Sequence, residues 1–193
     1  MNYFDLSGRV AVVTGGNGGI GLAMAEGLAG AGADIVVAAR DAGKGATAVA
    51  KLQAFGVRSA FIRVDVRDPD SISDLIESVG KEFGGLDILV NNAGTNDRKQ
   101  PEEYTLDEWQ TIIDTNLTSA FVASQKVYPY MSRVGGGKII NIGSMMSIFG
   151  ASFTVPYASS KGAIVQMTKG MACAWAKDNV QVNAVLPGWI DTT

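Results

Sequence analysis

The sequence predicts a doubly wound α/β fold, in which a parallel sheet carries helices on both faces. Short apolar runs alternate with helix-periodic segments along all 193 residues. Most of these runs are continuously apolar rather than alternating in polarity, which is typical of strands buried on both faces. With 47% apolar and 18% charged residues, the chain can bury one sizeable core. We therefore expect a single domain over residues 1–193.

The expected strands and helices alternate regularly. Strands are predicted at the apolar runs 9–14, 35–39, 60–64, 86–90, 138–142 and 180–185. Helices are predicted at about 19–31, 43–55, 70–83, 106–131 and 157–177. Asp70-Ser71 offers cap-like residues for the third helix, and Gly84 stands where that helix should end. Because crossovers between parallel strands are right-handed, a ligand crevice is expected beyond the carboxyl ends of the strands, where the strand order reverses.

Composition excludes several classes of function. A net charge of −3 without a basic tract argues against binding to nucleic acid or to an anionic membrane surface. No stretch approaches a membrane span and the N-terminus lacks a signal-peptide pattern, so a cytoplasmic protein is expected. The single Cys173 precludes an intrachain disulfide and is expected to be a small core residue. Because the chain contains no His, His-ligated zinc is excluded, and acid–base chemistry must use Tyr, Lys, Asp, Glu or a thiol. No metal site is predicted.

A glycine-rich turn, TGGNGGIG at residues 14–21, joins the first predicted strand to the first helix. Such a turn lets backbone N–H groups at a helix N-terminus approach a pyrophosphate, although an ordinary tight turn is the alternative. Gly15 would turn the chain out of the strand, Gly19 would open the phosphate approach, and Gly21 would permit close helix packing. The predicted cofactor-binding residues of this turn are Gly15, Asn17, Gly18, Gly19, Ile20 and Gly21.

Tyr157 and Lys161 form the more specific signal. Their i, i+4 spacing places them on one face of a helix, where an ammonium favours the ionised form of a phenol. Ser144 follows the fifth strand, so its hydroxyl could hydrogen-bond the same reacting oxygen. Asn116 lies within a helical pattern, where a polar residue needs a reason. Taken singly, these residues also fit a surface Tyr, a solvated Lys, a capping Ser and a helix-kinking Asn.

Together these motifs resemble the short-chain dehydrogenase/reductase family, in its form with a TGxxxGIG cofactor loop and a YxxxK active site. The resemblance runs from Arg9 to Thr193, essentially the whole chain. It rests on motifs in family order and at family-like spacing: Thr14 to Gly21, Asp65-Val66, Asn91 to Gly94, Asn116, Ser144, Tyr157, Lys161 and Pro187-Gly188. It implies a Rossmann-type sheet and an NAD(P)-dependent oxidoreductase acting on a carbonyl or secondary alcohol.

The resemblance also implies roles for individual residues. Tyr157 would be the catalytic acid–base, Lys161 would favour its phenolate and bond the nicotinamide ribose, Ser144 would hold the substrate oxygen, and Asn116 would position a proton-relay water. In the cofactor site, Asp65 would contact the adenine amino group and Val66 the side of its ring. The adenosine ribose would lie against Asn92, Ala93 and Gly94, and the nicotinamide against Pro187, Gly188, Ile190 and Thr192.

Cofactor choice depends on the end of the second strand. An acid there would bond the ribose 2′-OH of NAD, whereas an Arg would accept the 2′-phosphate of NADP. Ala39 occupies the place of the acid and Arg40 follows, which favours NADP(H), with NAD(H) still possible. Two features weigh against that preference: Gly18 lacks a basic side chain, and Asp41 could offset the charge of Arg40.

The substrate is less determined. General resemblance is greatest to the sugar-acid and 3-oxoacyl reductase branches, and Arg98-Lys99 could place a cation near an anionic substrate, although such a pair is also typical of solvated surface. Relatives usually continue past Pro187-Gly188 with a substrate lid, another helix and a seventh strand. We expect these segments to be absent after Thr193.

Two further hypotheses concern other classes of function. One is a non-catalytic, dinucleotide-binding regulatory or assembly protein. The other adds to the enzyme: in the family, the two long helices, here near 106–131 and 157–177, form an oligomer interface. A homodimer or homotetramer is therefore expected alongside a small-molecule substrate.

Overall fold

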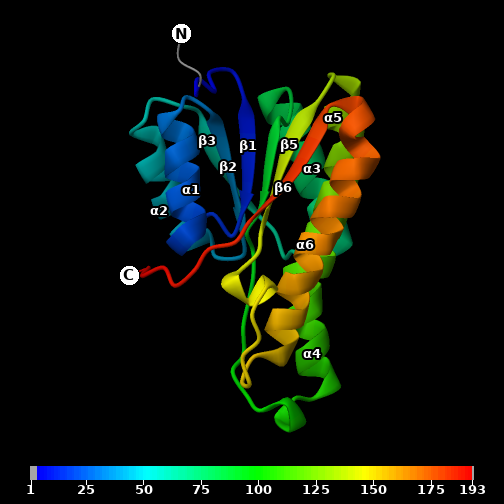
Figure 1. Cartoon of the computed structure of the whole chain (residues 1–193). Coiled ribbons are helices and arrows are strands. Elements are labelled where there is room, and N and C mark those ends of the chain that lie inside the picture. The colour runs from blue at the N-terminus through cyan, green and yellow to red at the C-terminus, as the bar shows by residue number, and fades with distance from the viewer. Residues whose placement is uncertain (1–3, 193) are drawn as a thin grey trace.

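The computed structural model describes residues 4–192. Their strands form one parallel sheet in the order β3-β2-β1-β4-β5-β6 (Figure 1). The strands are β1 (Val10–Thr14), β2 (Asp34–Ala39), β3 (Ser59–Arg63), β4 (Ile88–Asn91), β5 (Gly137–Ile142) and β6 (Val180–Val185). The prediction of a doubly wound parallel sheet is confirmed, with each strand within two residues of its expected bounds.

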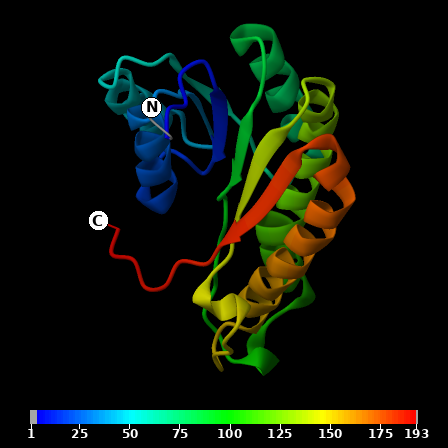
Figure 2. The same ribbon diagram turned by 45° about the horizontal axis from the view of Figure 1, so that its top comes forward.

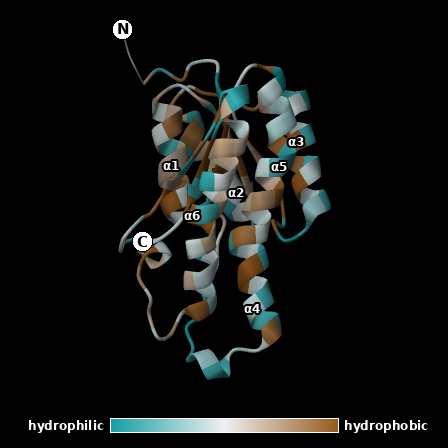
Figure 3. Cartoon of the chain, turned by 45° about the vertical axis from the view of Figure 1, so that its right-hand side comes forward, coloured by the Kyte–Doolittle hydropathy of each residue, from teal (hydrophilic) through white to brown (hydrophobic). Residues whose placement is uncertain are grey.

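The helices lie on both faces of the sheet. They are α1 (Gly19–Gly30), α2 (Ala42–Gln53), α3 (Pro69–Phe83), α4 (Leu106–Ile113), α5 (Ser119–Arg133) and α6 (Val155–Trp175). In the hydropathy colouring of Figure 3, brown strands lie between helices whose outer faces are largely pale or teal. Within residues 4–192, no helix combines the length and apolarity that a membrane span requires.

Successive strand residues divide between two cores. Val12 and Val36 pack with the apolar sides of α3, α5 and α6, whereas Ala11 and Ile35 pack with those of α1 and α2. Because neighbouring strand residues point to opposite faces, a continuously apolar strand supplies both cores at once. This explains why the strands read as unbroken apolar runs in the sequence.

Helix α3 begins and ends through local backbone chemistry. Asp68 is its N-cap and accepts the Asp70 N–H at 3.0 Å, with Pro69 as the first helical residue. The cap therefore precedes the Asp70-Ser71 pair that the sequence suggested, because proline suits the first helical position. Gly84 ends the helix at φ 82°, as predicted.

The predicted helix 106–131 is not continuous. A π-helical segment, Asp114–Thr118, separates α4 from α5, and α5 continues to Arg133. Such a segment inserts an extra residue into the helix and is common at functional sites. The segment contains Asn116, the polar residue that the sequence placed within a helix, and its side chain is buried.

A second prediction was wrong: Cys173 is exposed on α6 rather than in the core.

The strand order reverses between β1 and β4, which are neighbours in the sheet although two βα units separate them in sequence. The carboxyl ends of the strands lie together at the lower edge of the sheet in Figure 1. Beyond β6 the chain crosses that edge toward the start of α1, as Figure 2 also shows. Ligand sites of doubly wound folds lie in this position.

Candidate active site

The glycine turn has the geometry that its sequence suggested. Gly15 and Gly19 have φ of 65° and 52°, in the left-handed region that glycine adopts without strain. A Cβ on Gly21 would lie 2.3 Å from the Gly15 carbonyl oxygen and 2.4 Å from Asn92 Nδ2. Gly21 is therefore required by close packing of α1 against the turn.

The first turn of α1 is open to a ligand. Its N-cap, Gly18, supplies no side-chain hydrogen bond, whereas Asp41, Asp68 and Thr105 cap α2, α3 and α4. No atom lies within 4 Å of the place where a Gly18 Cβ would stand. The start of α6 also lacks a side-chain cap, but only the start of α1 follows the glycine turn. A pyrophosphate would supply acceptors for the uncapped N–H groups of α1.

Thr14 joins this turn to the segment after β4. Its hydroxyl donates to the Val90 carbonyl and accepts the N–H groups of Asn92 and Ala93, each at 3.0 Å. The Asn92 amide in turn donates to the carbonyls of Thr14 and Gly15. The sequence did not reveal these bonds, because the partners are more than 70 residues apart.

A cleft of about 930 Å³ opens beside these two segments. Among its lining residues are most of those predicted for the phosphates and adenosine: Gly15, Asn17, Gly18, Gly19, Arg40, Asp65, Val66, Asn92, Ala93 and Gly94. The predicted Ile20 and Gly21 are not among the lining residues, and the structure adds Ala38, Ala39, Asp41, Lys44, Val64, Arg67, Thr95, Thr111 and Thr115. The place of Lys44 in the cleft could have been predicted from the sequence, because Lys44 follows Arg40 by only four residues. A second cleft, at the amino ends of β1, β4 and β5, contains none of the predicted site residues.

Arg40, directly after β2, lines this cleft. Arg40 is exposed, and within residues 4–192 no carboxylate forms an ion pair with it. Asp41 is occupied as the N-cap of α2, where it accepts the Lys44 N–H at 3.0 Å. Asp41 therefore forms no ion pair with Arg40 that would neutralise its charge.

Asp65 follows β3, the strand next to β2, and also lines the cleft. The Arg67 guanidinium donates to both of its carboxylate oxygens, at 3.2 and 2.8 Å. These bonds lower the pKa of the Asp65 carboxyl to about 2. Asp65 is accordingly a carboxylate at neutral pH, which leaves it able to accept a hydrogen bond from an amino group.

Tyr157 and Lys161 meet at the start of α6. The helix begins at Val155, so Tyr157 lies in its first turn and Lys161 one turn further along. Lys161 Nζ is 5.8 Å from the centre of the Tyr157 ring and donates to the Ile142 carbonyl at 2.6 Å. Although it carries a charge, Lys161 is only 4% exposed. A buried ammonium at the end of β5 is costly, and perturbed groups of this kind mark functional sites.

Burial lowers the pKa of the Lys161 ammonium from 10.5 to about 8, because the charged form loses its water. The folded state therefore binds this proton more weakly than the unfolded chain does. Between pH 8 and 10.5, unfolding takes up a proton, and the free energy of unfolding rises with pH. The cost of burying the charge is fully present below pH 8 and is relieved above it.

Lys161→Met should isolate this effect. The free energy of unfolding of the wild type, minus that of the variant, should increase by about 2 kcal/mol between about pH 7 and about pH 9.5. Urea unfolding of both proteins across this range measures the difference, in which all other titrating groups cancel. A difference that does not change with pH would show that the ammonium keeps its ordinary affinity for protons.

The Asn116 side chain makes three hydrogen bonds, to two residues. Its Oδ1 accepts the Thr95 N–H at 2.7 Å, and its Nδ2 donates to the Thr95 carbonyl and to Ser160 Oγ. The Ser160 hydroxyl donates to the Tyr157 carbonyl at 2.7 Å. Asn116 thus connects the π-helical segment, the loop after β4 and the first turn of α6. A Cβ on Gly94 would lie 3.4 Å from Asn116 Oδ1 and 3.7 Å from Lys161 Nζ, so the nucleotide cleft adjoins this group.

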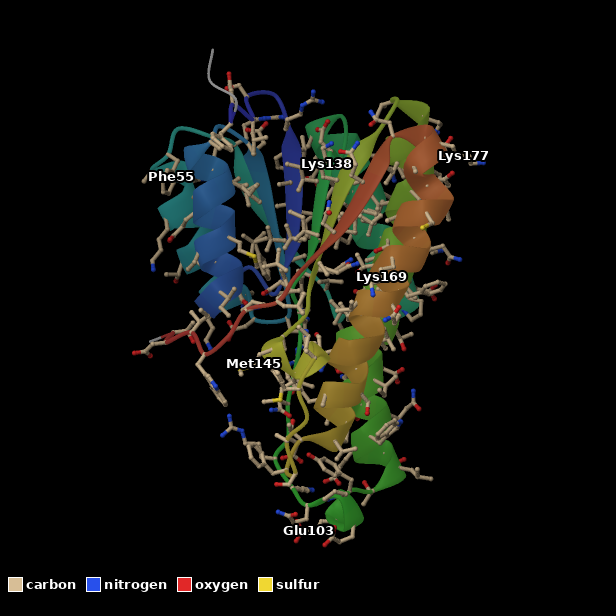
Figure 4. All side chains as sticks on the ribbon, viewed as in Figure 1. Phe55, Glu103, Lys138, Met145, Lys169 and Lys177 are labelled. Carbon is tan, nitrogen blue, oxygen red and sulfur yellow. The ribbon has the colours of Figure 1, made fainter. Side chains whose placement is uncertain are left out.

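Ser144 comes two residues after β5 and is buried. Its hydroxyl accepts the Met146 N–H at 3.1 Å, within the short turn Met145–Ser147. Met145, labelled in Figure 4, marks this turn at the lower end of β5, opposite Lys138 at the strand's start. The remaining donor proton of the Ser144 hydroxyl is free to reach a substrate oxygen.

The segment after β6 contacts both the Ser144 turn and the glycine turn. The Pro187 carbonyl accepts the Met145 N–H at 3.0 Å. Thr192 lies beside the glycine turn, since a Cβ on Gly19 would be 3.8 Å from Thr192 Cβ. Gly188 and Ile190, between them, are exposed. Residues 187–192 therefore bridge the Ser144 turn and the phosphate turn, where the nicotinamide was predicted.

A family model described as short chain dehydrogenase matches residues 9–193. The chain belongs to the short-chain dehydrogenase family. The gluconate 5-dehydrogenase of Gluconobacter oxydans (strain 621H) is 38% identical over 191 residues, which are 99% of this chain and 75% of that protein. Membership of the short-chain dehydrogenases confirms the prediction of an NAD(P)-dependent oxidoreductase.

Solved structures of short-chain dehydrogenases superimpose closely. L-Sorbose reductase from Gluconobacter frateurii, complexed with NADPH and L-sorbose, has a TM-score of 0.95 and 38% identity over 98% of this chain and 72% of that one. A xylitol dehydrogenase with bound NAD+ has a TM-score of 0.93 and 32% identity, over 96% of this chain and 72% of its own. The roles of individual site residues in this chain stay predictions.

Proposed function

We propose that this short-chain dehydrogenase catalyses reversible hydride transfer between NADP(H) and a hydroxyl or carbonyl carbon of a sugar acid. The observation that carries the proposal is the buried Lys161 ammonium beside Tyr157, where Gly94 of the nucleotide cleft adjoins Lys161 and Asn116. Lys161 bonds the Ile142 carbonyl, two residues before Ser144. The cofactor fits the residues present, because the uncapped start of α1 offers amide donors to its phosphates.

The protein supplies position and proton transfer. When bound, the nicotinamide ring supplies or accepts the hydride. Tyr157 gives its phenolic proton to the substrate oxygen in reduction and takes a proton from it in oxidation. The Lys161 ammonium stabilises the phenolate electrostatically, and Ser144 donates a hydrogen bond to the substrate oxygen. Asn116 holds α6 and the loop after β4 together, so these groups keep their mutual distances.

NADP(H) is favoured by the cations at the end of β2. Arg40 lines the cleft without an ion-pair partner in the described part of the chain, and Lys44 lines it four residues on. A 2′-phosphate would supply the negative charge that both lack. Among the relatives, L-sorbose reductase is complexed with NADPH and xylitol dehydrogenase with NAD+, so the family accommodates both cofactors.

A carboxylate on the substrate is supported by the loop after β4. Lys99 is paired with Asp97 and Glu108. Arg98 is exposed, has no carboxylate partner within residues 4–192, and its guanidinium carbon lies 5.6 Å from the centre of the Phe153 ring. Phe153 precedes the first residue of α6 by two positions, so Arg98 lies near the end of that helix that carries Tyr157. The sequence could not separate the two cations; their contacts do.

The decisive assay compares an acidic with a neutral keto sugar. NADPH oxidation should be faster with 5-keto-D-gluconate, which carries a carboxylate, than with L-sorbose. Arg98→Met should raise KM for the keto acid by about tenfold to a hundredfold, the value of a hydrogen bond to a charged group, and leave KM for L-sorbose unchanged.

Arg133→Met is the matched control, because Arg133 also lies over an aromatic ring, 4.9 Å from the Tyr130 centre, at the opposite end of the sheet. It should change neither KM. No turnover with any keto sugar, keto acid or acyl thioester would reject the proposed function. Equal effects of Arg98→Met on both substrates would reject only the carboxylate site.

We also propose that the chain assembles with copies of itself through the outer faces of α4, α5 and α6. Leu106 at the start of α4 is 84% exposed and Phe121 on α5 is 45% exposed, and large apolar side chains of this kind favour contact with a partner. A cytoplasmic location stays a prediction.

The presence of all four candidate catalytic residues argues against a non-catalytic regulatory or assembly protein: Asn116, Ser144, Tyr157 and Lys161.

A further inference from the structure

Ser147 connects two parts of the site through one hydroxyl. Its Oγ donates to the Lys161 carbonyl at 2.7 Å and accepts the Ser144 N–H at 3.1 Å. One half-buried side chain therefore joins the backbones of two residues that we assign to catalysis. Ser147 itself lies on the turn after β5 and is not expected to touch the substrate.

The turn formed by residues 144–147 has few other attachments. The Met145 N–H bonds to the Pro187 carbonyl, and the Ser147 N–H bonds back to Ser144 within the turn. Among the hydrogen bonds of residues 4–192, the Ser147–Lys161 bond is the one that joins this turn to α6. Without it, the position of Ser144 relative to α6 would depend on packing and on the end of β5.

The surrounding space is shaped for this hydroxyl. A Cβ on Gly143 would lie 2.9 Å from Ser147 Oγ, so a larger residue at position 143 would displace the side chain. A Cβ on Gly162 would lie 3.9 Å from the Ser147 carbonyl oxygen, which places the turn directly on α6 (Figure 4). Two glycines thus leave room for the turn and its hydroxyl against the helix.

We infer that Ser147 is a positioning residue that sets the distance between the Ser144 hydroxyl and the Tyr157–Lys161 pair. The inference rests on the proposed roles of those three residues. Proton transfer and hydrogen bonding to one substrate oxygen require the Tyr157 and Ser144 hydroxyls both to lie within hydrogen-bond distance of that oxygen. A displacement of about 1 Å in such a group can lower the rate by about a hundredfold.

The test is a double-mutant cycle between Ser144→Ala and Ser147→Ala in the full chain. Ser147→Ala alone should lower kcat by about tenfold to a hundredfold and leave KM for NADPH unchanged, since the phosphate turn lies elsewhere. In the Ser144→Ala background, adding Ser147→Ala should change kcat by less than about twofold, because the group that Ser147 positions is already gone.

Two variants keep the test specific. Ser147→Cys keeps one heavy atom at the γ position, although the thiol is bulkier and a weaker donor than the hydroxyl, so it should show an intermediate loss of kcat. Ser73→Ala removes a similar serine-to-carbonyl bond, 2.9 Å long, from the remote helix α3 and should not change kcat.

The outcomes are separable. Equal losses from Ser147→Ala in both backgrounds would show a general structural effect and overturn the inference. An unchanged kcat for Ser147→Ala, beside a strong loss for Ser144→Ala, would overturn the inference and leave the proposed function intact. If Ser144→Ala itself has full activity, the proposed catalytic role of Ser144 fails, and the inference fails with it.

Discussion

Tyr157→Phe is expected to lower kcat by about two to four orders of magnitude, the usual size of a general acid–base contribution. The variant removes only the hydroxyl and keeps the ring, whose centre lies 5.8 Å from Lys161 Nζ. Cofactor affinity should therefore stay nearly unchanged, because the nucleotide cleft and Lys161 remain. Steady-state reduction of the best keto sugar and fluorescence titration with NADPH measure the two quantities separately.

Tyr130→Phe is the matched control for this variant. Tyr130 also loses one hydroxyl, but it lines the second cleft at the amino ends of the strands. Its kcat should equal that of the wild type. A Tyr157→Phe enzyme with most of its activity would exclude the phenol as the proton donor, and the proposed mechanism would have to be abandoned.

Replacing Ala39 by Asp and Arg40 by Ile should reverse the cofactor preference. Both residues line the cleft, Ala39 at the end of β2 and Arg40 directly after it. The new carboxylate would accept a hydrogen bond from the ribose 2′-OH of NADH and repel a 2′-phosphate, while the guanidinium that binds this phosphate is removed. Each change is worth about 1.5–3 kcal/mol, so the ratio of kcat/KM for NADPH to that for NADH should fall by about two to four orders of magnitude.

The reversal needs its own controls. Arg63→Ile removes an exposed Arg from the end of β3, outside the cleft lining, and should leave the ratio unchanged. Arg40→Ile alone should lose NADPH efficiency about tenfold to a hundredfold without gaining NADH efficiency. A wild type that prefers NADH, or a double variant with an unaltered ratio, would show that the end of β2 does not select the cofactor.

Local features of the sequence predicted the elements of the fold and the motifs of the site. Continuous apolar runs predicted the central strands β1, β2 and β4, because strands buried on both faces need apolar side chains on both. The edge strand β6 is instead buried at alternate residues. Gly84 predicted the end of α3, since the left-handed conformation there is open mainly to glycine. The spacing of Tyr157 and Lys161 predicted their shared helical face, because successive helical turns fix it.

Boundaries and interruptions were predicted less well. The pattern from 106 to 131 has the helical period on both sides of residues 114–118, and inserting one residue hardly disturbs that period. The exposure of Cys173 was missed because α6 has small residues on several faces, so its apolar side is poorly marked in the sequence.

Consecutive residues thus determined the strands, the glycine turn and the candidate catalytic side chains, because backbone sterics and side-chain periodicity act over a few residues. Tertiary structure alone decided that Lys161 is buried against the Ile142 carbonyl, and that Ser147 joins the Ser144 turn to α6. It alone decided that Lys99 has acidic partners and Arg98 none in the described chain. Burial, ion pairing and hydrogen bonding of these groups depend on segments far apart in sequence, which only packing of the helices on the sheet brings within contact distance.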